Sequence, residues 1–522
     1  MVGPVTRSPL LLDLALSALA GVALWAAFPD LSWWWTTVPA LALYFSRIDH
    51  AGVGRGLLNT LVFAACWWFP LIDWVPLATG GTLPWVALAA TQILAILLFA
   101  LIARLLRVWA WTRTALGQCG AYALVWVGVE QLRSHYPWSG FPWGNVAMPQ
   151  VDSPLGRLAP WGGEVLVSLV VVALAVGLRR VFGLRADEDS AHWYTRPAIL
   201  VLGAAIVAGA WALPLPASQE AGSLRVGVVQ GDVELPGADT FAVEGKVAGN
   251  NAAMTRELAA NGGGVDLGIW GETGADRDPR ESALVSRILD SSVGALGAPI
   301  LFGFANVQDD LRWNWLGVWR TGEGLDPDAL YAKQKPVPFG EFIPFRSVIS
   351  KLATEAAQVN LDMAAADNPG ILHVGLADGR TIPIAVGICF ESAYPSVIGE
   401  GVRLGGEVIV TPSNNYHFRS SAESAQQAQL LRFRAMEFSR SAIQASTTGE
   451  SVVIRPDGSI QASTKPQTAA WLAESVPLRT SITPAARMGE IPADVVMIAT
   501  VVLAIASLGG AIASRGRGRA SN

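Results

Sequence analysis

The stretch SLRVGVVQGDV, residues 223–233, marks the point at which the chain changes character. The 216 residues that open the chain contain no lysine and consist largely of apolar runs near the length that crosses a bilayer. After this stretch, short apolar strands alternate with helical segments up to about residue 478. The sequence therefore predicts a polytopic α-helical membrane domain joined to an α/β domain.

Composition agrees with a membrane protein, because 52% of the 522 residues are hydrophobic and only 15% are charged. An eighth helix is expected after the α/β domain, in VVMIATVVLAIASLGGAIAS at 495–514. A cleavable signal peptide is the alternative for the first apolar run, but more membrane-length segments follow it at once. The seven helices expected before the α/β domain span 9–28, 31–46, 56–75, 83–106, 116–132, 161–183 and 197–214.

The arginines of the loops predict an orientation, since Lys and Arg accumulate in short cytoplasmic loops. With a cytoplasmic amino terminus, thirteen arginines fall in cytoplasmic segments and only Arg133 and Arg157 in the short loops of the other face. We therefore expect both termini in the cytoplasm and the α/β domain outside it. The thirteen are Arg7, Arg47, Arg55, Arg104, Arg107, Arg113, Arg179, Arg180, Arg185, Arg196, Arg515, Arg517 and Arg519.

Alternation of strands and helices in the second part predicts sheets covered by helices. Helices are expected at 243–260, 280–296, 393–403 and 421–440. Strands are expected at 224–230, 265–271, 299–305, 313–320, 382–389 and 407–412, with more in 442–456 and near 469–475.

Several function classes are disfavoured by composition and motifs. No dinucleotide, Walker or zinc-ligand spacing occurs and the five histidines are scattered, so neither a cofactor nor a metal is expected. A net charge of −5 without a basic face in the α/β domain argues against nucleic acid as a partner. Cys66 and Cys119 fall in predicted membrane helices and Cys389 does not, which implies no disulfide framework.

Three residues able to carry chemistry lie at predicted strand ends: Glu272 in IWGET, Lys333 in YAKQKPVPFGEF and Cys389 in GICFESAYP. An acid, an amine and a thiol brought together by a sheet is the pattern of a nucleophile with its base and electrostatic partner. Each has an ordinary alternative, because cysteine is often core packing, glutamate a turn residue and lysine a surface charge. Spacing does not join the three positions, so the residues alone leave these alternatives open.

Together these segments resemble the nitrilase (carbon–nitrogen hydrolase) superfamily, and more closely its membrane branch, the apolipoprotein N-acyltransferases. The motifs are YAKQKPVPFGEFIP, GICFES and EQLRSHYPWSGFPW (130–143), and the likeness covers nearly the whole chain. It implies an inserted nitrilase-like αββα sandwich. The implied domains are a seven-helix membrane domain at 1–217, an extracytoplasmic catalytic domain at 222–480, and a linker, eighth helix and basic cytoplasmic tail at 481–522.

The resemblance implies a role for each matching residue. Glu272 corresponds to a general base, Lys333 to the triad lysine and Cys389 to the nucleophile. Glu341, Glu391 and Phe390 would support the site or bind an oxyanion, Lys335 receives no catalytic role, and segment 346–370 is a candidate mobile lid. Substrate contacts are expected from Trp138, Phe141, Trp143, Asn414 and His417.

The implied reaction takes a fatty acyl group from a phospholipid onto Cys389 as a thioester. The acyl group then passes to the N-terminal α-amino group of an S-diacylglyceryl cysteine in an apolipoprotein. The implied partners are the phospholipid donor, the modified apolipoprotein and the lipid of a bacterial cytoplasmic (inner) membrane, with no cofactor. A membrane-tethered amidase or hydrolase with the same triad and a non-catalytic lipoprotein-binding scaffold are the alternatives.

The chain departs from the family pattern at four places near the expected site. WGET stands for the usual WPET, Pro336 for a common Leu, Phe390 for Tyr and SNNYHF (413–418) for SNDAWF. None of these changes removes a triad group, so we expect them to affect rate or lipid preference more than activity.

Overall fold

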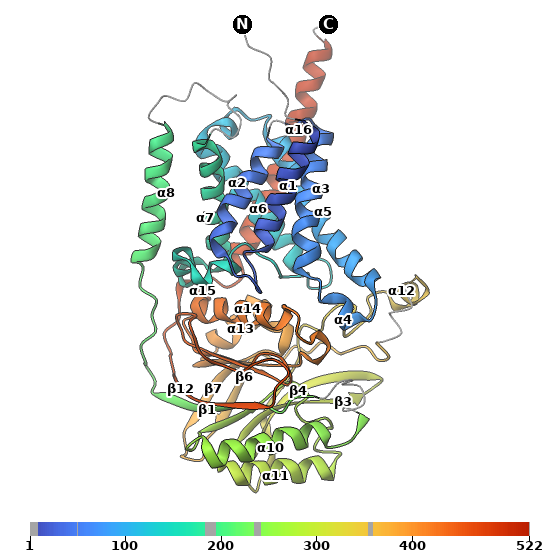
Figure 1. Ribbon diagram of the computed structural model, residues 1–522, viewed down its shortest axis with the longest axis vertical. Helices are drawn as coiled ribbons and strands as arrows, with labels where there is room; N and C mark the ends of the chain where they lie inside the picture. The colour runs from blue at the N-terminus through green and yellow to red at the C-terminus, as the bar shows by residue number, and fades with distance from the viewer. Residues whose placement is uncertain (1–8, 50, 183–194, 234–241, 353–358, 521–522) are drawn as a thin grey trace. The chain divides into compact units, whose positions relative to one another are not determined.

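The computed structural model describes residues 9–49, 51–182, 195–233, 242–352 and 359–520 (Figure 1). The chain divides into two compact units. The first comprises residues 1–73, 85–214 and 490–522, and the second residues 74–84 and 215–489.

The first unit is built from apolar helices, one in each range that the sequence predicts. Thr82–Leu106, Pro154–Val181 and Ile491–Ser514 are long and apolar enough to cross a membrane, and Leu10–Trp25 and Arg196–Ala212 are shorter apolar helices. The main helices of this unit are α1 (Leu10–Trp25), α2 (Thr37–Ile48), α3 (Val53–Leu71), α5 (Thr82–Leu106), α6 (Ala115–His135), α7 (Ala159–Val181), α8 (Thr195–Ala212) and α16 (Ile491–Ala520).

One helix of this unit begins later than predicted. The range 31–46 becomes α2 from Thr37 onward, because Trp34–Thr36 forms a separate 3-10 turn, η1. Aromatic side chains then hold the helices together. The rings of Tyr44 and Phe63 stack 4.0 Å apart, and those of Phe99 and Trp126 meet edge to face at 5.0 Å.

The second unit contains two six-stranded sheets. Their strand orders are β12-β1-β2-β3-β4-β5 and β11-β10-β9-β8-β7-β6. The first sheet consists of β1 (Ser223–Gln230), β2 (Leu267–Trp270), β3 (Ile300–Gln308), β4 (Leu311–Arg320), β5 (Gly324–Ala332) and β12 (Ala470–Pro477). The second consists of β6 (Ile371–Gly375), β7 (Thr381–Val386), β8 (Val408–Ser413), β9 (Ala442–Ser446), β10 (Val452–Ile454) and β11 (Ile460–Ser463).

Helices cover the outer face of each sheet (Figure 1). Those over the first sheet are α10 (Lys246–Asn261) and α11 (Ala283–Leu296), and those over the second are α13 (Pro395–Arg403) and α14 (Glu423–Phe438). Shorter helices are α4 (Val75–Thr79), α12 (Arg346–Leu352) and α15 (Pro484–Met488). The predicted αββα sandwich is confirmed by these four layers.

Alternating side chains explain why the sheets are buried on both faces. Along β3, Leu301 points into the core between the sheets, whereas Ile300 and Phe302 pack under α10 and α11. Apolar residues at every position of such a strand therefore fill two separate cores.

Two predictions about this unit need correction. The strand expected at 382–389 ends at Val386, and Cys389 opens a 3-10 helix, η6 (Cys389–Ala393). The chain turns there because the Glu391 carboxylate accepts a hydrogen bond from the Ile388 N–H at 2.7 Å. Strands β5, β6 and β11 were absent from the predicted set.

The candidate lid at 346–370 is only partly described, since residues 353–358 lie outside the described residues.

Candidate active site

Glu272, Lys333 and Cys389 come from three different strand ends and meet in one place. Glu272 follows β2, Lys333 follows β5 of the same sheet, and Cys389 opens η6 after β7 of the other sheet. The Lys333 Nζ lies 3.7 Å from the Glu272 Oε1, and the Cys389 thiol donates a hydrogen bond to the Glu272 carboxylate. The fold thus brings together an acid, an amine and a thiol that the sequence separates by more than fifty residues each.

Lys333 is a buried ammonium between two carboxylates. The residue is 1% exposed, and Nζ donates to the Glu341 Oε1 at 2.7 Å. The second oxygen of Glu341 accepts from the Val337 N–H at 2.8 Å, which fixes the carboxylate in the turn after β5. Burial would lower the pKa of Lys333, but the charges of Glu341 and Glu272 outweigh it and raise the pKa above its usual value. Lys333 therefore stays protonated.

Glu272 is held at both its side chain and its main chain. Its Oε1 accepts from the Asn314 Nδ2 at 2.6 Å, its N–H donates to the Ser413 carbonyl at 3.3 Å, and its carbonyl accepts from the Thr447 hydroxyl at 2.8 Å. Burial raises the pKa of this carboxyl, and the nearby Lys333 opposes the rise. A carboxylate with a raised pKa in contact with a thiol can accept its proton.

Gly271 occupies the position at which the resembled family usually has proline, and the local packing explains the glycine. A Cβ at this position would lie 2.7 Å from the Thr447 N and Oγ1. The main chain of Thr447 therefore approaches the turn too closely for a larger residue, and the departure from WPET fits the local packing.

Cys389 adopts a backbone conformation that favours glycine, with φ of 54°. Such residues are found where the surrounding structure imposes the conformation, often at functional sites. Burial and the charge of Glu272 raise the pKa of the Cys389 thiol well above its usual value, while Lys333 lowers it. The thiol is therefore protonated at rest and needs a base to become a nucleophile.

Glu391 connects the segments that carry Lys333 and Cys389. Its carboxylate is fully buried and accepts from the N–H groups of Gln334, Lys335 and Ile388 at 2.7, 2.8 and 2.7 Å, and from the Tyr331 hydroxyl at 2.9 Å. Lys335 thus contributes its main chain to this contact. Phe390, also expected here, is buried against the ring of Tyr394 at 5.5 Å.

The expected substrate contacts divide between the two units. Asn414 lies beside the turn that carries Glu272, because its Nδ2 donates to the hydroxyl of the next residue, Thr273, at 2.5 Å. His417 is exposed, with its ring 3.6 Å from that of Tyr416. Trp138, Phe141 and Trp143 belong to the first unit, in the loop after α6, where the Phe141 and Trp143 rings stack at 6.0 Å.

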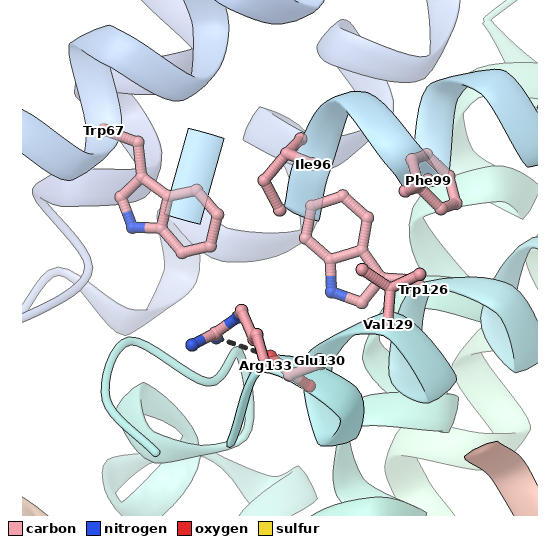
Figure 2. Close-up of a pocket in the computed structure, with 7 residues that line it drawn as sticks. All are labelled: Trp67, Ile96, Phe99, Trp126, Val129, Glu130 and Arg133. Atoms are coloured by element: carbon pink, nitrogen blue, oxygen red, sulfur yellow. Dashed lines mark ion pairs between the residues drawn. The ribbon is translucent and has the colours of Figure 1, made fainter. Parts of the chain in front are cut away.

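Within the EQLRSHYPWSGFPW motif, Glu130 and Arg133 are buried polar residues of the first unit. Figure 2 shows a pocket there that contains Glu130 and Arg133, whose nearest charged atoms are 3.8 Å apart. Arg133 donates to the carbonyls of Phe141 and Trp143 at 3.1 and 2.8 Å, so it fixes the loop after α6. Glu272, Lys333 and Cys389 do not line this pocket, whose walls are Trp67, Ile96, Phe99, Trp126, Val129, Glu130 and Arg133.

Sequence reasoning missed Asn314 and Asn415. Asn314 is 3% exposed and is an amide within the apolar strand LRWNWLGVWR, a signal that could have found it. Asn415 is buried and donates to the carboxylate of Glu423, and only its place in SNNYHF pointed to it.

Comparison with solved structures gives neighbours in the nitrilase superfamily. A mutant of the Nesterenkonia AN1 amidase from that superfamily is 14% identical, covers 50% of this chain and 93% of its own, and has a TM-score of 0.37. Saccharomyces cerevisiae Nit3, a member of branch 10 of the superfamily, is 14% identical over 50% of this chain and 91% of its own, with a TM-score of 0.36.

Comparison by sequence reaches across both units. The family model of the apolipoprotein N-acyltransferase N-terminal domain matches residues 20–177. An apolipoprotein N-acyltransferase of Ralstonia nicotianae is 29% identical over 92% of this chain and 90% of its own. One of Mycolicibacterium smegmatis is 32% identical over 94% of this chain and 84% of its own length. Because identity at this level extends over nearly the full length of both proteins, the chain belongs to the apolipoprotein N-acyltransferase family.

Proposed function

We propose that this chain transfers a fatty acyl group from a phospholipid, through a thioester on Cys389, to the N-terminal α-amino group of S-diacylglyceryl-cysteine in apolipoproteins. The observation that carries the proposal is the contact of the Cys389 thiol with Glu272, whose carboxylate lies 3.7 Å from the Lys333 ammonium. Membership of the family supports the class of reaction.

In the first half-reaction Glu272 accepts the thiol proton as the Cys389 sulfur attacks an ester carbonyl of the phospholipid. The carbonyl oxygen becomes an oxyanion, which the Lys333 ammonium and the Phe390 N–H would stabilise by roughly 3 kcal/mol each. When the carbon–oxygen bond breaks, Glu272 returns the proton to the leaving oxygen. Lysophospholipid departs and the acyl group remains on sulfur.

In the second half-reaction the free α-amino group of the apolipoprotein attacks the thioester carbonyl. Glu272 accepts a proton from the attacking nitrogen, and the carbon–sulfur bond breaks to leave an amide. That proton then restores the Cys389 thiol, so the enzyme returns to its starting state and one site serves two acyl substrates in turn.

The proposed location is a bacterial cytoplasmic membrane, with the domains bounded at 1–217, 222–480 and 481–522. Helices of the first unit that are long and apolar enough to span a bilayer support membrane insertion. The arginine distribution favours cytoplasmic termini and an extracytoplasmic catalytic domain. Substrate contacts are proposed for Trp138, Phe141, Trp143, Asn414 and His417.

Intact-mass measurement of the purified full-length protein tests the proposal. Incubation with phospholipid should add one acyl mass, mapped to the peptide that contains Cys389, and a diacylglyceryl-cysteine peptide should then remove it. Cys389→Ser should abolish both steps, whereas Cys66→Ser and Cys119→Ser should keep them. Transfer that persists in Cys389→Ser would overturn the proposal.

The same assay separates the alternatives. Release of free fatty acid without acylation of the peptide would identify a hydrolase. Peptide binding that is equal in wild type, Cys389→Ser and Glu272→Ala, with no acyl adduct in any of them, would identify a scaffold.

A further inference from the structure

Glu423 is a buried carboxyl that the reaction above does not use. It is the first residue of α14, it is 4% exposed, and α14 packs against η6, which begins with Cys389. Its Oε2 accepts from the Asn415 Nδ2 at 2.8 Å. Among the described residues, no Lys, Arg or His forms an ion pair with it.

A chain of amide side chains links Glu423 to the main chain of Glu272. The Asn415 Nδ2 also donates to the Gln427 Oε1 at 2.9 Å, and the Gln427 Nε2 donates to the Ser413 hydroxyl at 3.0 Å. The Ser413 carbonyl in turn accepts from the Glu272 N–H at 3.3 Å. The hydrogen bonds that begin at Glu423 therefore extend to the turn that carries Glu272.

The titratable groups around Glu423 come from several elements. Two of them interact with it electrostatically: the charge of Glu272 acts on Glu423, and the charge of Glu423 acts on Cys389. Besides the effect of burial, the charge of Arg312 on β4 lowers the pKa of Tyr416 and of His417, and the charge of Arg432 on α14 lowers the pKa of Glu450. Glu272 follows β2 and Cys389 opens η6. Tyr416 and His417 in η7 (Tyr416–Phe418) follow Asn415 directly in the chain, and the Glu450 N–H after β9 donates to the Ser424 hydroxyl, next to Glu423.

A buried carboxyl without a cation favours its neutral form. Burial raises the pKa of Glu423 to about 8, with the Asn415 hydrogen bond lowering it and the Glu272 charge raising it. At neutral pH the group is therefore largely protonated, and the site contains one negative charge fewer than its carboxyls would suggest.

We propose that Glu423 is a positioning residue of the acyl-transfer site. Its neutral carboxyl holds the Asn415, Gln427 and Ser413 chain behind Glu272, and its ionisation opposes the negative charge that must develop on the Cys389 sulfur. The inference rests on the proposed function, because it concerns the formation of that thiolate.

The test is the pH dependence of Cys389 acylation in a single turnover, followed by mass spectrometry on the full-length protein. Phosphatidylglycerol in mixed detergent micelles serves as the donor, because it brings no amine that titrates. Wild type should lose about tenfold in rate between pH 7 and pH 9 as Glu423 ionises. Glu423→Gln, which stays neutral and can still accept from Asn415, should change less than about twofold over this range.

Two further variants separate positioning from general stability. Glu450→Gln, another partly buried carboxyl beside α14, should keep the wild-type profile. Glu423→Ala should acylate more slowly at pH 7 than Glu423→Gln, because it loses the contact with Asn415, and thermal melting reports whether it folds. An alkaline limb in Glu423→Gln that equals that of wild type would overturn the inference and leave the proposed function standing. Absence of any Cys389 adduct in wild type at every pH would instead overturn the proposed function.

Discussion

At the scale of single residues, the charge balance of the candidate site depends on one buried lysine. Lys333 is the buried cation that contacts both Glu272 and Glu341, at 3.7 and 2.7 Å. Two carboxylates share it, so its ammonium both lowers the cost of burying them and remains charged to meet an oxyanion.

Replacement of Lys333 by methionine should lower the rate of Cys389 acylation by roughly 10²–10³-fold. The methionine keeps the length of the side chain and removes the charge. Acylation is measured by mass spectrometry and folding by thermal melting. Lys335→Met is the matched control, since Lys335 contacts Glu391 only through its N–H, and it should remain near the wild-type rate. Equal rates in both variants would contradict the role of Lys333.

Glu272 must be ionised to accept the thiol proton, so its pKa sets the acid limb of the pH–rate profile of acylation. Because burial raises that pKa, acylation should fall with decreasing pH already above the range of an ordinary carboxyl. Asn314 favours the charged form by donating to Oε1 at 2.6 Å. Asn314→Ala should therefore move the limb to still higher pH.

The rate of acylation between pH 4 and 7 checks this shift. Asn306→Ala, on the neighbouring strand β3, serves as the control because the Asn306 side chain contacts Trp315 and not Glu272. A limb that stays in place in Asn314→Ala would show that the amide does not stabilise the carboxylate.

At the scale of elements, Glu391 holds the end of β5 to the start of η6. Four donors point at its carboxylate, so Glu391→Gln would place an amide NH₂ against an N–H or hydroxyl that also donates. The expected loss of stability is about 2–4 kcal/mol, because a buried acceptor for several donors is removed. Acylation should fall as well, since Lys333 and Cys389 lie within two residues of the contacts.

Chemical denaturation and single-turnover acylation measure both effects. Glu400→Gln on α13 is the control, and it should leave the free energy of unfolding within about 0.5 kcal/mol of wild type. An unchanged unfolding free energy in Glu391→Gln would contradict a structural role for these hydrogen bonds.

The elements that sequence reasoning found and missed differ in their place in the sheets. Interior strands such as β3 and β8 are apolar on both faces and were predicted. The missed strands β5, β6 and β11 all lie at sheet edges, where one side has no strand partner and polar residues or proline are tolerated; the fourth edge strand, β12, was predicted. β5, for example, contains Asp326, Pro327 and Asp328.

The residues of the candidate site could be predicted from the sequence, but their arrangement could not. Glu272, Lys333 and Cys389 were recognised from motifs, but their proximity depends on strands of two sheets and cannot be derived from spacing. The turn at Cys389 was predicted as strand because apolar periodicity does not register the side-chain contact from Glu391 to the Ile388 N–H.

At the scale of the whole molecule, the proposed orientation places residues of the second unit outside the cell membrane. Single cysteines in a background in which Cys66, Cys119 and Cys389 are all replaced by serine test it. Ser420→Cys, at an exposed position after η7, should react with an impermeant maleimide on intact cells, and Gly54→Cys, beside Arg55, only after lysis. Labelling in the reverse order would contradict the orientation that the arginines predict.

The sheets of the second unit begin in chain order with β1 and end with β12, and these strands run antiparallel with Ser223 opposite Pro477. Just beyond them the Glu220 carboxylate accepts from the N–H groups of Thr480 and Ser481 at 2.8 and 2.7 Å and pairs with Arg479 at 2.7 Å. A force that pulls apart the chain segments before β1 and after β12 would load the Glu220 contacts first. It would then break the hydrogen bonds between β1 and β12 one pair at a time. Tension along the chain would therefore break the contacts next to β1 and β12 before it disturbed the surroundings of Cys389.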